Sequence, residues 1–278
     1  MKIAYTAWTW LQDEYNAWAP MSDKPKRDFE ASLRDLHACG YRYLEDFNIV
    51  ADIFDGCPEE FAALTRKYEI EFVNLYHYLT ADFEYDRKKT EQCIAFMKAQ
   101  GTTQMNLEPP RKAPGQVIGE KELAEVAQHC DILGGMCRDA GISLALHPHW
   151  GTYVEREDQI DYFLAHTRRD CVGLCLDTAH TVLCGMDPEK LFAKYLAQGV
   201  LKYVHFKDID PDETAHPEYP PRRFRALGQG TVNFPGVLRV LRAGGYDNVI
   251  CVELDFNRVN NYESAYTSRK YIYDVLGL

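Results

Sequence analysis

Four apolar stretches of the sequence end in side chains that are able to bind a metal ion. The stretches read ISLALH, VGLCLD, LKYVH and VICVE, and they end at His147, Asp177, His205 and Glu253. Two imidazoles and two carboxylates form a mixed nitrogen and oxygen set, which suits Mn²⁺, Co²⁺, Fe²⁺ or Zn²⁺ better than Ca²⁺. If the four stretches meet, we expect one divalent ion between them, with manganese favoured.

Short apolar stretches bounded by turn residues are typical of strands buried on both faces of a parallel sheet. Helical patterns alternate with such stretches along the whole chain, and the strands are expected near 2–8, 41–46, 69–78, 102–110, 142–149, 172–180, 201–208 and 248–255. Strict alternation predicts an α/β fold, a single (β/α)8 TIM barrel. A doubly wound sheet is the alternative, but no GxGxxG follows the first strand.

The length of the chain and the position of the polar residues agree with a barrel. At 278 residues the chain is close to the about 250 residues of one barrel, so we expect residues 1–278 to form one domain. Barrels gather their site residues at the C-terminal ends of the strands, where the four candidate ligands would meet. The stretch 210–234 is rich in Pro, Arg and Gly and is long for a compact domain, so it predicts a binding loop or lid.

The composition limits the classes of partner. A formal net charge of −11 repels phosphate groups, so neither a nucleic acid nor an anionic membrane is an expected partner. The sequence predicts no membrane span and no signal peptide, because no apolar run approaches the about 18 residues that a span requires. The nine cysteines are scattered and odd in number, which indicates reduced thiols in a cytoplasmic protein.

Three histidines are candidates for proton transfer. His147 and His149 would point to the same side if the strand continues through Pro148, since side chains along a strand repeat with period two. One would bind the metal ion and the other would contact substrate or move a proton, and two structural histidines beside a turn are the alternative. His180 follows Asp177 by three residues and is a candidate proton donor or partner of a substrate hydroxyl.

Charged residues at other strand ends are further candidates. Lys207 is a candidate general acid or substrate clamp, whereas an ion pair with Asp208 that caps the strand is the structural alternative. Glu45 and Glu108 end the second and fourth strands, and such residues also commonly bond loop backbone. We expect Glu45 to bind substrate and Glu108 to take part in catalysis.

Further residues are candidates for balancing the charge of Glu253 and for lining the substrate pocket. A buried carboxylate without compensation costs several kcal/mol, so a metal ion or one of Arg223 and Arg225 must offset it. The same two arginines lie on the long loop and are candidates for substrate binding. Trp150 offers a stacking face for a sugar ring, and His77 ends the third strand and could face the pocket.

At these residues the chain resembles the xylose isomerase-like TIM barrel superfamily, and within it the sugar phosphate isomerase/epimerase group. ALHPHWGTYVE, GLCLDTAH and YVHFKDID look especially like the inosose dehydratase branch, which is similar to subunits acting on 3-keto-glycosides. The resemblance implies a divalent metal ion held by Glu, Asp, His and Glu at the ends of strands five to eight. Asp177, His205 and Glu253 match three of these ligands, whereas His147 stands where the isomerases and epimerases usually carry Glu.

That departure weakens an isomerase or epimerase assignment, because the glutamate serves there as ligand and proton carrier. The resemblance implies a metal-dependent lyase or dehydratase that acts on a keto-cyclitol or keto-sugar through a metal-stabilised enolate. His149 or His147 would be the base, and His180 or Lys207 the acid or substrate clamp. A sugar (phosphate) isomerase or epimerase is the alternative, followed by a zinc endonuclease and by a sugar-binding barrel without turnover. The keto-glycoside relatives make a complex with a partner subunit conceivable, beside a homo-oligomer.

Overall fold

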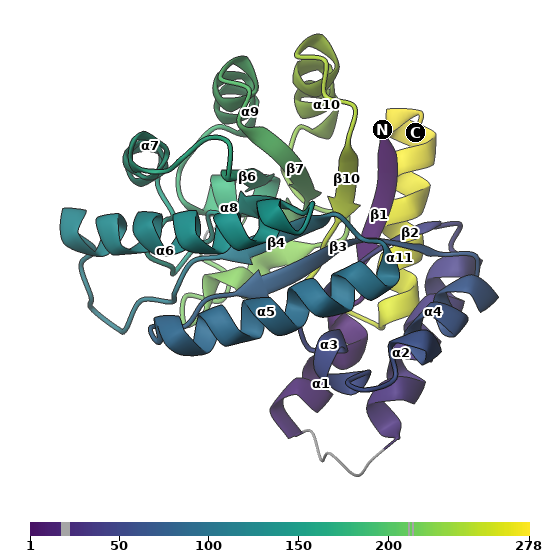
Figure 1. The fold of residues 1–278 in the computed structure, drawn as a ribbon. Coiled ribbons are helices and arrows are strands. Elements are labelled where there is room, and N and C mark those ends of the chain that lie inside the picture. Colours follow the sequence, from purple (N-terminus) through teal and green to yellow (C-terminus); the bar gives the residue numbers. More distant parts are fainter. Residues whose placement is uncertain (18–22, 211, 213) are drawn as a thin grey trace.

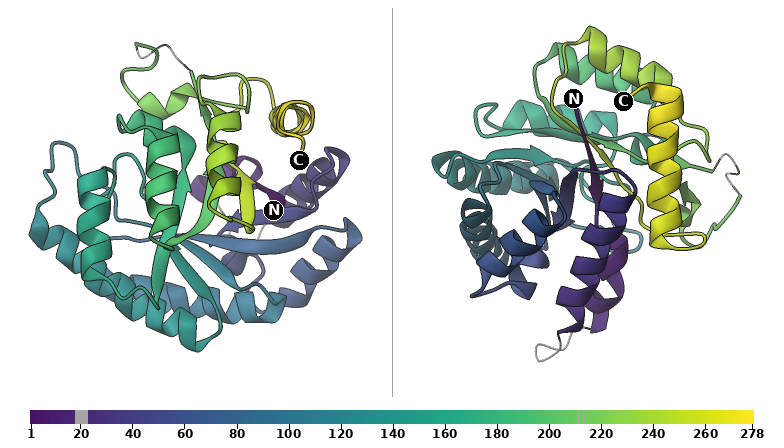
Figure 2. Two further views of the ribbon diagram at one scale, coloured as in Figure 1. Left: turned by 90° about the horizontal axis from the view of Figure 1, so that it is seen from above. Right: turned by 90° about the vertical axis from the view of Figure 1, so that its right-hand side faces the viewer.

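The computed structural model describes residues 1–17, 23–210, 212 and 214–278, and it contains a closed barrel of parallel strands surrounded by helices (Figure 1, Figure 2). Each barrel strand pairs with the next one along the chain, and β10 (Val249–Val252) closes the barrel against β1 (Lys2–Thr6). The predicted (β/α)8 TIM barrel is confirmed.

The other barrel strands lie between these two in chain order. They are β2 (Tyr43–Phe47), β3 (Glu71–Tyr78), β4 (Gln104–Glu108), β5 (Ser143–Leu146), β6 (Val172–Asp177) and β7 (Leu201–Phe206). The helices are α1 (Trp8–Ala17), α2 (Lys24–Ala38), α3 (Val50–Ile53), α4 (Pro58–Lys67), α5 (Phe83–Gln100), α6 (Glu120–Asp139), α7 (Glu157–His166), α8 (Thr178–Leu183), α9 (Pro188–Ala197), α10 (Phe234–Ala243) and α11 (Asn261–Tyr271), followed by the π-helix η2 (Ile272–Leu276). Within the described ranges, none of these helices is both long and apolar enough to span a membrane.

Side-chain caps fix where several helices begin. Asp82 accepts a hydrogen bond from the backbone N–H of Tyr85, so α5 begins at Phe83. Asp187 caps α9 in the same way, with a proline in its first turn. Asn233 caps α10.

Several strand ends were predicted too long. β1 stops at Thr6, and Trp8 begins a helix instead of ending the strand. The stretch VGLCLDTAH divides at Asp177, because Oδ1 of this residue accepts the backbone N–H of His180 at 2.7 Å and thereby starts α8. β5 also stops at Leu146, so the strand does not continue through Pro148 to His149.

The alternation of side chains along the strands builds the floor of the site. Ala145, Cys175, Tyr203 and Cys251 pack together as a small buried cluster inside the barrel. Each lies two residues before one of the four candidate ligands, so those ligands form the next layer toward the C-terminal ends of the strands. The larger apolar cluster fills the space between the strands and the surrounding helices.

The stretch 210–234 is partly ordered by one buried carboxylate. Asp208 begins β8 (Asp208–Ile209), which pairs with β9 (Phe224–Arg225) after the short 3₁₀ helix η1 (Pro220–Arg223). The Asp208 carboxylate accepts backbone N–H groups of Gly228, Gly230 and Val232 at 2.8 to 3.0 Å. A Cβ atom at Gly230 would lie 2.4 Å from this carboxylate, so only glycine fits there.

Candidate metal centre

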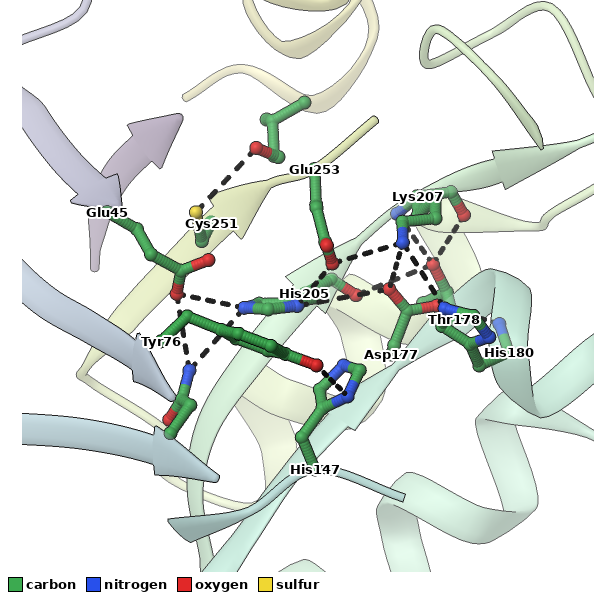
Figure 3. A network of polar contacts seen from close by, with 12 residues as sticks. Glu45, Tyr76, His147, Asp177, Thr178, His180, His205, Lys207, Cys251 and Glu253 are labelled. Atoms are coloured by element: carbon green, nitrogen blue, oxygen red, sulfur yellow. Dashed lines mark hydrogen bonds and ion pairs between the residues drawn. The ribbon is translucent and has the colours of Figure 1, made fainter. Parts of the chain in front are cut away.

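Four side chains from neighbouring strand ends converge inside the barrel (Figure 3). His147 follows β5, Asp177 ends β6, His205 lies in β7 and Glu253 follows β10. Each residue offers one ligand atom, and these atoms lie within 4.8 Å of one another. The structure thus brings together the four residues that we expect to bind a metal ion.

Each of these residues carries a buried polar atom that has no hydrogen-bond partner among the described residues: Nε2 of His147, Oδ2 of Asp177, Nδ1 of His205 and Oε2 of Glu253. Such atoms are rare, because an unpaired buried polar group costs about 1–3 kcal/mol. Nδ1 of His205 and Oε2 of Glu253 lie 2.6 Å apart without the alignment of a hydrogen bond, as expected of atoms directed at a common point. The donor set therefore fits a divalent ion with nitrogen and oxygen ligands.

Glu45 holds the far side of the His205 ring. Its Oε2 lies 3.0 Å from Nε2 of His205 and also accepts hydrogen bonds from the side-chain amides of Asn74 and Asn106. A carboxylate only accepts, so Nε2 carries a proton, and Nδ1, which faces Glu253, is the nitrogen that a metal ion would bind. Carboxylates commonly orient metal-binding histidines in this way. Because Glu45 is fully buried behind the ring (Figure 3), we now expect it to position His205 rather than to bind substrate.

Lys207 supplies the positive charge beside the carboxylates. Its buried Nζ lies 3.0 Å from Asp255, 3.1 Å from Glu253 and 3.7 Å from Asp177. Burial alone would lower the pKa of Lys207, but these carboxylates raise it, so the amine stays protonated. Burial raises the pKa of Asp177 to about 7, whereas at Glu253 the effects of Lys207 and His205 outweigh burial and hold the pKa well below its usual value.

The arginines of the long loop have other partners. Arg225 donates to Oδ2 of Asp210 at 2.9 Å, and Arg223 donates to the backbone carbonyl of Asp210 at 2.8 Å. The alternative in which one of them offsets Glu253 is therefore wrong, and their binding of substrate stays a prediction. The alternative Lys207–Asp208 ion pair is also wrong, because Asp208 is bound by loop N–H groups and Lys207 faces other carboxylates.

Two more imidazoles lie beside the proposed ligands. The ring centroids of His149 and His180 are 3.7 Å apart. Burial lowers the pKa values of His147, His149 and His180, so all three are expected to be neutral at pH 7. Nδ1 of His149 lies 2.7 Å from the carbonyl oxygen of Trp150, and Nε2 of His180 lies 3.3 Å from the Lys207 ammonium. His149 therefore keeps a lone pair on Nε2, and His180 keeps its proton on Nδ1.

A cavity of about 500 Å³ is lined in part by residues that follow His149 and His180 in the chain, although none of the three histidines lines it. Its lining includes Arg111, Trp150, Gly151, Glu155 and Leu183, which belong to the segments after β4, β5 and β6. It therefore opens at the C-terminal end of the barrel, with Trp150 as an aromatic wall. This volume suits a small molecule.

Sequence reasoning misplaced one residue and left others without a role. His77 was considered as a residue that could face the pocket. It follows the inward-facing Tyr76 in β3, so its side chain lies on the opposite face of the strand, where its Nδ1 is 2.9 Å from the side-chain amide of Asn48. Burial lowers the pKa of His77 to about 3. Asn74 and Asp255 contact the site although we assigned neither of them a role. The sequence could have indicated both, because side chains two residues apart in a strand point to the same side, and Asn74 and Asp255 lie two residues from Tyr76 and Glu253.

Comparisons with known proteins agree with this architecture. The family model described as "Xylose isomerase-like TIM barrel" matches residues 33–273. The inosose dehydratase of Lacticaseibacillus casei is 30% identical over 164 residues, which cover 55% of this chain and 54% of that enzyme. The match thus spans about half the length of that relative.

Solved structures of low sequence identity share the fold over nearly the whole chain. The probable 3-DHS dehydratase AsbF from Bacillus anthracis has a TM-score of 0.76 at 17% identity, covering 99% of this chain and 100% of its own. The structure of "IOLI protein with a binding zinc atom" has a TM-score of 0.76 at 18% identity, covering 100% and 98%. Because the family model matches most of its length, the chain belongs to the xylose isomerase-like TIM barrel family.

Proposed function

We propose that this protein is a divalent-metal-dependent dehydratase, a lyase that removes water from a keto-cyclitol or keto-sugar. The observation that carries the proposal is the convergence of four potential ligand atoms that have no hydrogen-bond partner among the described residues, on His147, Asp177, His205 and Glu253, beside two further imidazoles. The similarity to an inosose dehydratase supports this reaction and substrate class. The zinc atom named for the IOLI protein supports a metal ion in this fold.

A divalent ion held by His147, Asp177, His205 and Glu253 would supply Lewis acidity to the substrate carbonyl and would stabilise the negative charge that develops as the α-proton leaves. The remaining task of the chain is to take that proton and to return one to the departing hydroxyl. Both transfers need groups within hydrogen-bond reach of a substrate at the barrel mouth.

We assign the base to Nε2 of His149. Its Nδ1–H is held by the carbonyl of Trp150, which leaves the lone pair of Nε2 free to accept a proton from carbon. Its depressed pKa keeps the imidazole neutral and therefore able to act as a base at pH 7. His147 was the other candidate, but its unpartnered Nε2 belongs to the proposed metal ligands.

We assign the acid to His180, with Lys207 behind it. Nδ1–H of His180 has no partner among the described residues and is free to protonate the β-hydroxyl, which leaves as water. The Lys207 ammonium donates a hydrogen bond to Nε2 of the same ring at 3.3 Å and would stabilise the negative charge that develops on the ring as its proton leaves. Trp150 would pack against the ring of the substrate.

The test is a reaction with a panel of keto-cyclitols and keto-sugars. Purified protein loaded with Mn²⁺ is incubated with each compound in D₂O, and the products are analysed by mass spectrometry. The proposal predicts loss of one water from at least one substrate, and no reaction after the metal is removed with a chelator. Deuterium exchange at the α-carbon without loss of water would instead favour the isomerase or epimerase. If no compound shows either loss of water or deuterium exchange, the proposal is contradicted.

A further inference from the structure

Tyr76 of β3 lies between a carboxylate and one of the proposed metal ligands. Its hydroxyl oxygen is 2.8 Å from Oε2 of Glu108. The same oxygen is 3.1 Å from Nδ1 of His147 (Figure 3). The tyrosine ring is buried between Phe47 and His205, with centroid distances of 4.5 and 6.0 Å. Packing on both faces therefore holds the hydroxyl at a defined place beside the His147 ring.

The direction of the two hydrogen bonds follows from the number of protons available. Oε1 of Glu108 lies 2.8 Å from the Arg111 guanidinium, and an ion-paired carboxylate can only accept hydrogen bonds. The single hydroxyl proton of Tyr76 is therefore donated to Glu108, and the hydroxyl oxygen accepts from Nδ1–H of His147. A neutral imidazole has one proton, so its lone pair lies on Nε2, the atom that has no partner among the described residues.

We propose that Tyr76 and Glu108 are positioning residues, which fix His147 in the Nδ1–H tautomer and thereby make its Nε2 a metal ligand. This inference rests on the metal centre of the proposed function and deepens it. It gives Glu108 a different role from the catalytic one expected from the sequence. In His205 the arrangement is reversed: Glu45 bonds Nε2, so Nδ1 faces the proposed metal ion. The two imidazoles therefore use different nitrogens as ligands.

The first test compares metal affinities of two phenylalanine variants. Tyr76→Phe keeps the ring and removes only the hydroxyl. Tyr203→Phe is the matched control, because Tyr203 is equally buried inside the barrel and its ring lies 5.7 Å from that of His205, while within the described residues its hydroxyl makes no hydrogen bond to a proposed metal ligand. Competition with a chelating dye should show Zn²⁺ binding about 10- to 100-fold weaker in Tyr76→Phe than in the wild type, and unchanged in the control.

The second test reads the tautomer directly. Long-range ¹H–¹⁵N NMR spectra of metal-free protein labelled at histidine should place the His147 proton on Nδ1 in the wild type. In Tyr76→Phe the His147 proton should no longer prefer Nδ1. If Tyr76 only packed against its neighbours, the variant would keep the proton on Nδ1. If Tyr76→Phe does not fold, Glu108→Gln tests the same chain of hydrogen bonds. The glutamine amide can donate as well as accept, so the Tyr76 hydroxyl is no longer forced to donate its proton to residue 108. The inference then expects weaker Zn²⁺ binding.

The outcomes separate this inference from the proposed function, since neither test uses a substrate. Equal Zn²⁺ affinity of Tyr76→Phe and Tyr203→Phe, or a proton on Nε2 of His147 in the wild type, would overturn the inference and leave the metal centre in place. A wild type that binds no divalent ion would overturn both.

Discussion

The Nζ of Lys207 lies 3.1 Å from Oε2 of Glu253, which is one of the four proposed metal-ligand atoms. Asp177 and Asp255 also surround this ammonium, so one positive charge stands among three carboxylates. One ammonium offsets only one of these three carboxyl groups, so the site can also accept the positive charge of a divalent ion. Lys207 and a metal ion therefore complement one another in this site instead of competing for it.

Removing Lys207 should make stability depend more strongly on metal. In Lys207→Met the buried carboxylates lose their counter-charge, and breaking such a buried pair costs about 3–5 kcal/mol. We expect this loss in the free energy of unfolding of the metal-free protein, with a larger recovery on adding Mn²⁺ than in the wild type. Denaturant unfolding with chelator and with Mn²⁺ measures both. Lys89→Met, which removes a buried lysine paired with Asp52 outside the barrel, is the control, and the same metal response in both variants would count against this charge balance.

Substitution of a carboxylate ligand should remove metal and activity together. Asp177→Asn and Glu253→Gln each replace an ionised oxygen with a weaker neutral ligand. We expect metal content to fall, and activity to fall by about 10²-fold or more, since Lewis-acid stabilisation is worth several kcal/mol. Asp46→Asn is the control: it alters a buried carboxyl group of β2 that accepts the backbone N–H of Phe47, and this variant should keep both its metal content and its activity. Full metal content in both ligand variants, measured by elemental analysis, would reject the ligand assignment.

Substitutions of His147 and His149 should distinguish metal binding from proton transfer. His149→Gln should lower kcat by about 10²–10⁴-fold with metal content unchanged, because it removes the proposed base only. His147→Gln should lower metal content as well. Metal analysis and steady-state kinetics on the same preparations check this. The opposite pattern would exchange the roles of the two residues.

Much of the site follows from the period of the strands. Asp177 and His205 end apolar runs, and the parallel register of β6 and β7 places them side by side, as the sequence indicates. The positioning role of Glu45 does not follow, because β2 is far from β7 in the sequence and pairs with neither β6 nor β7; only barrel closure brings its carboxylate to His205.

Other features were missed for local reasons. The start of α8 at Thr178 depends on a cap made by Asp177. From the sequence, a cap for the following turn and a metal ligand were alternatives for this carboxylate, whereas in the structure it caps the helix and also lies among the four candidate ligands. Which carboxylate pairs with Lys207 depends on the direction in which its side chain points at the end of β7. The sequence suggested Asp208, the next residue, but loop N–H groups bind Asp208 and the Lys207 ammonium contacts Asp255 instead.

A histidine outside the site should make the protein sensitive to acid. Burial lowers the pKa of His77 to about 3, so the folded protein does not bind a proton there between pH 6.5 and 3, whereas the unfolded chain does. Stability is therefore lost as pH falls through this window, by about 2 kcal/mol at pH 5. Urea unfolding at pH 7.5 and pH 5 should show His77→Gln to be less affected than the wild type. An equal loss in both proteins would show that His77 does not cause the sensitivity.

The most direct measurement is anomalous diffraction from crystals grown with Mn²⁺. The account predicts one manganese peak bonded to Nε2 of His147, Oδ2 of Asp177, Nδ1 of His205 and Oε2 of Glu253. No peak between these residues, or the four side chains turned away from one another, would contradict it.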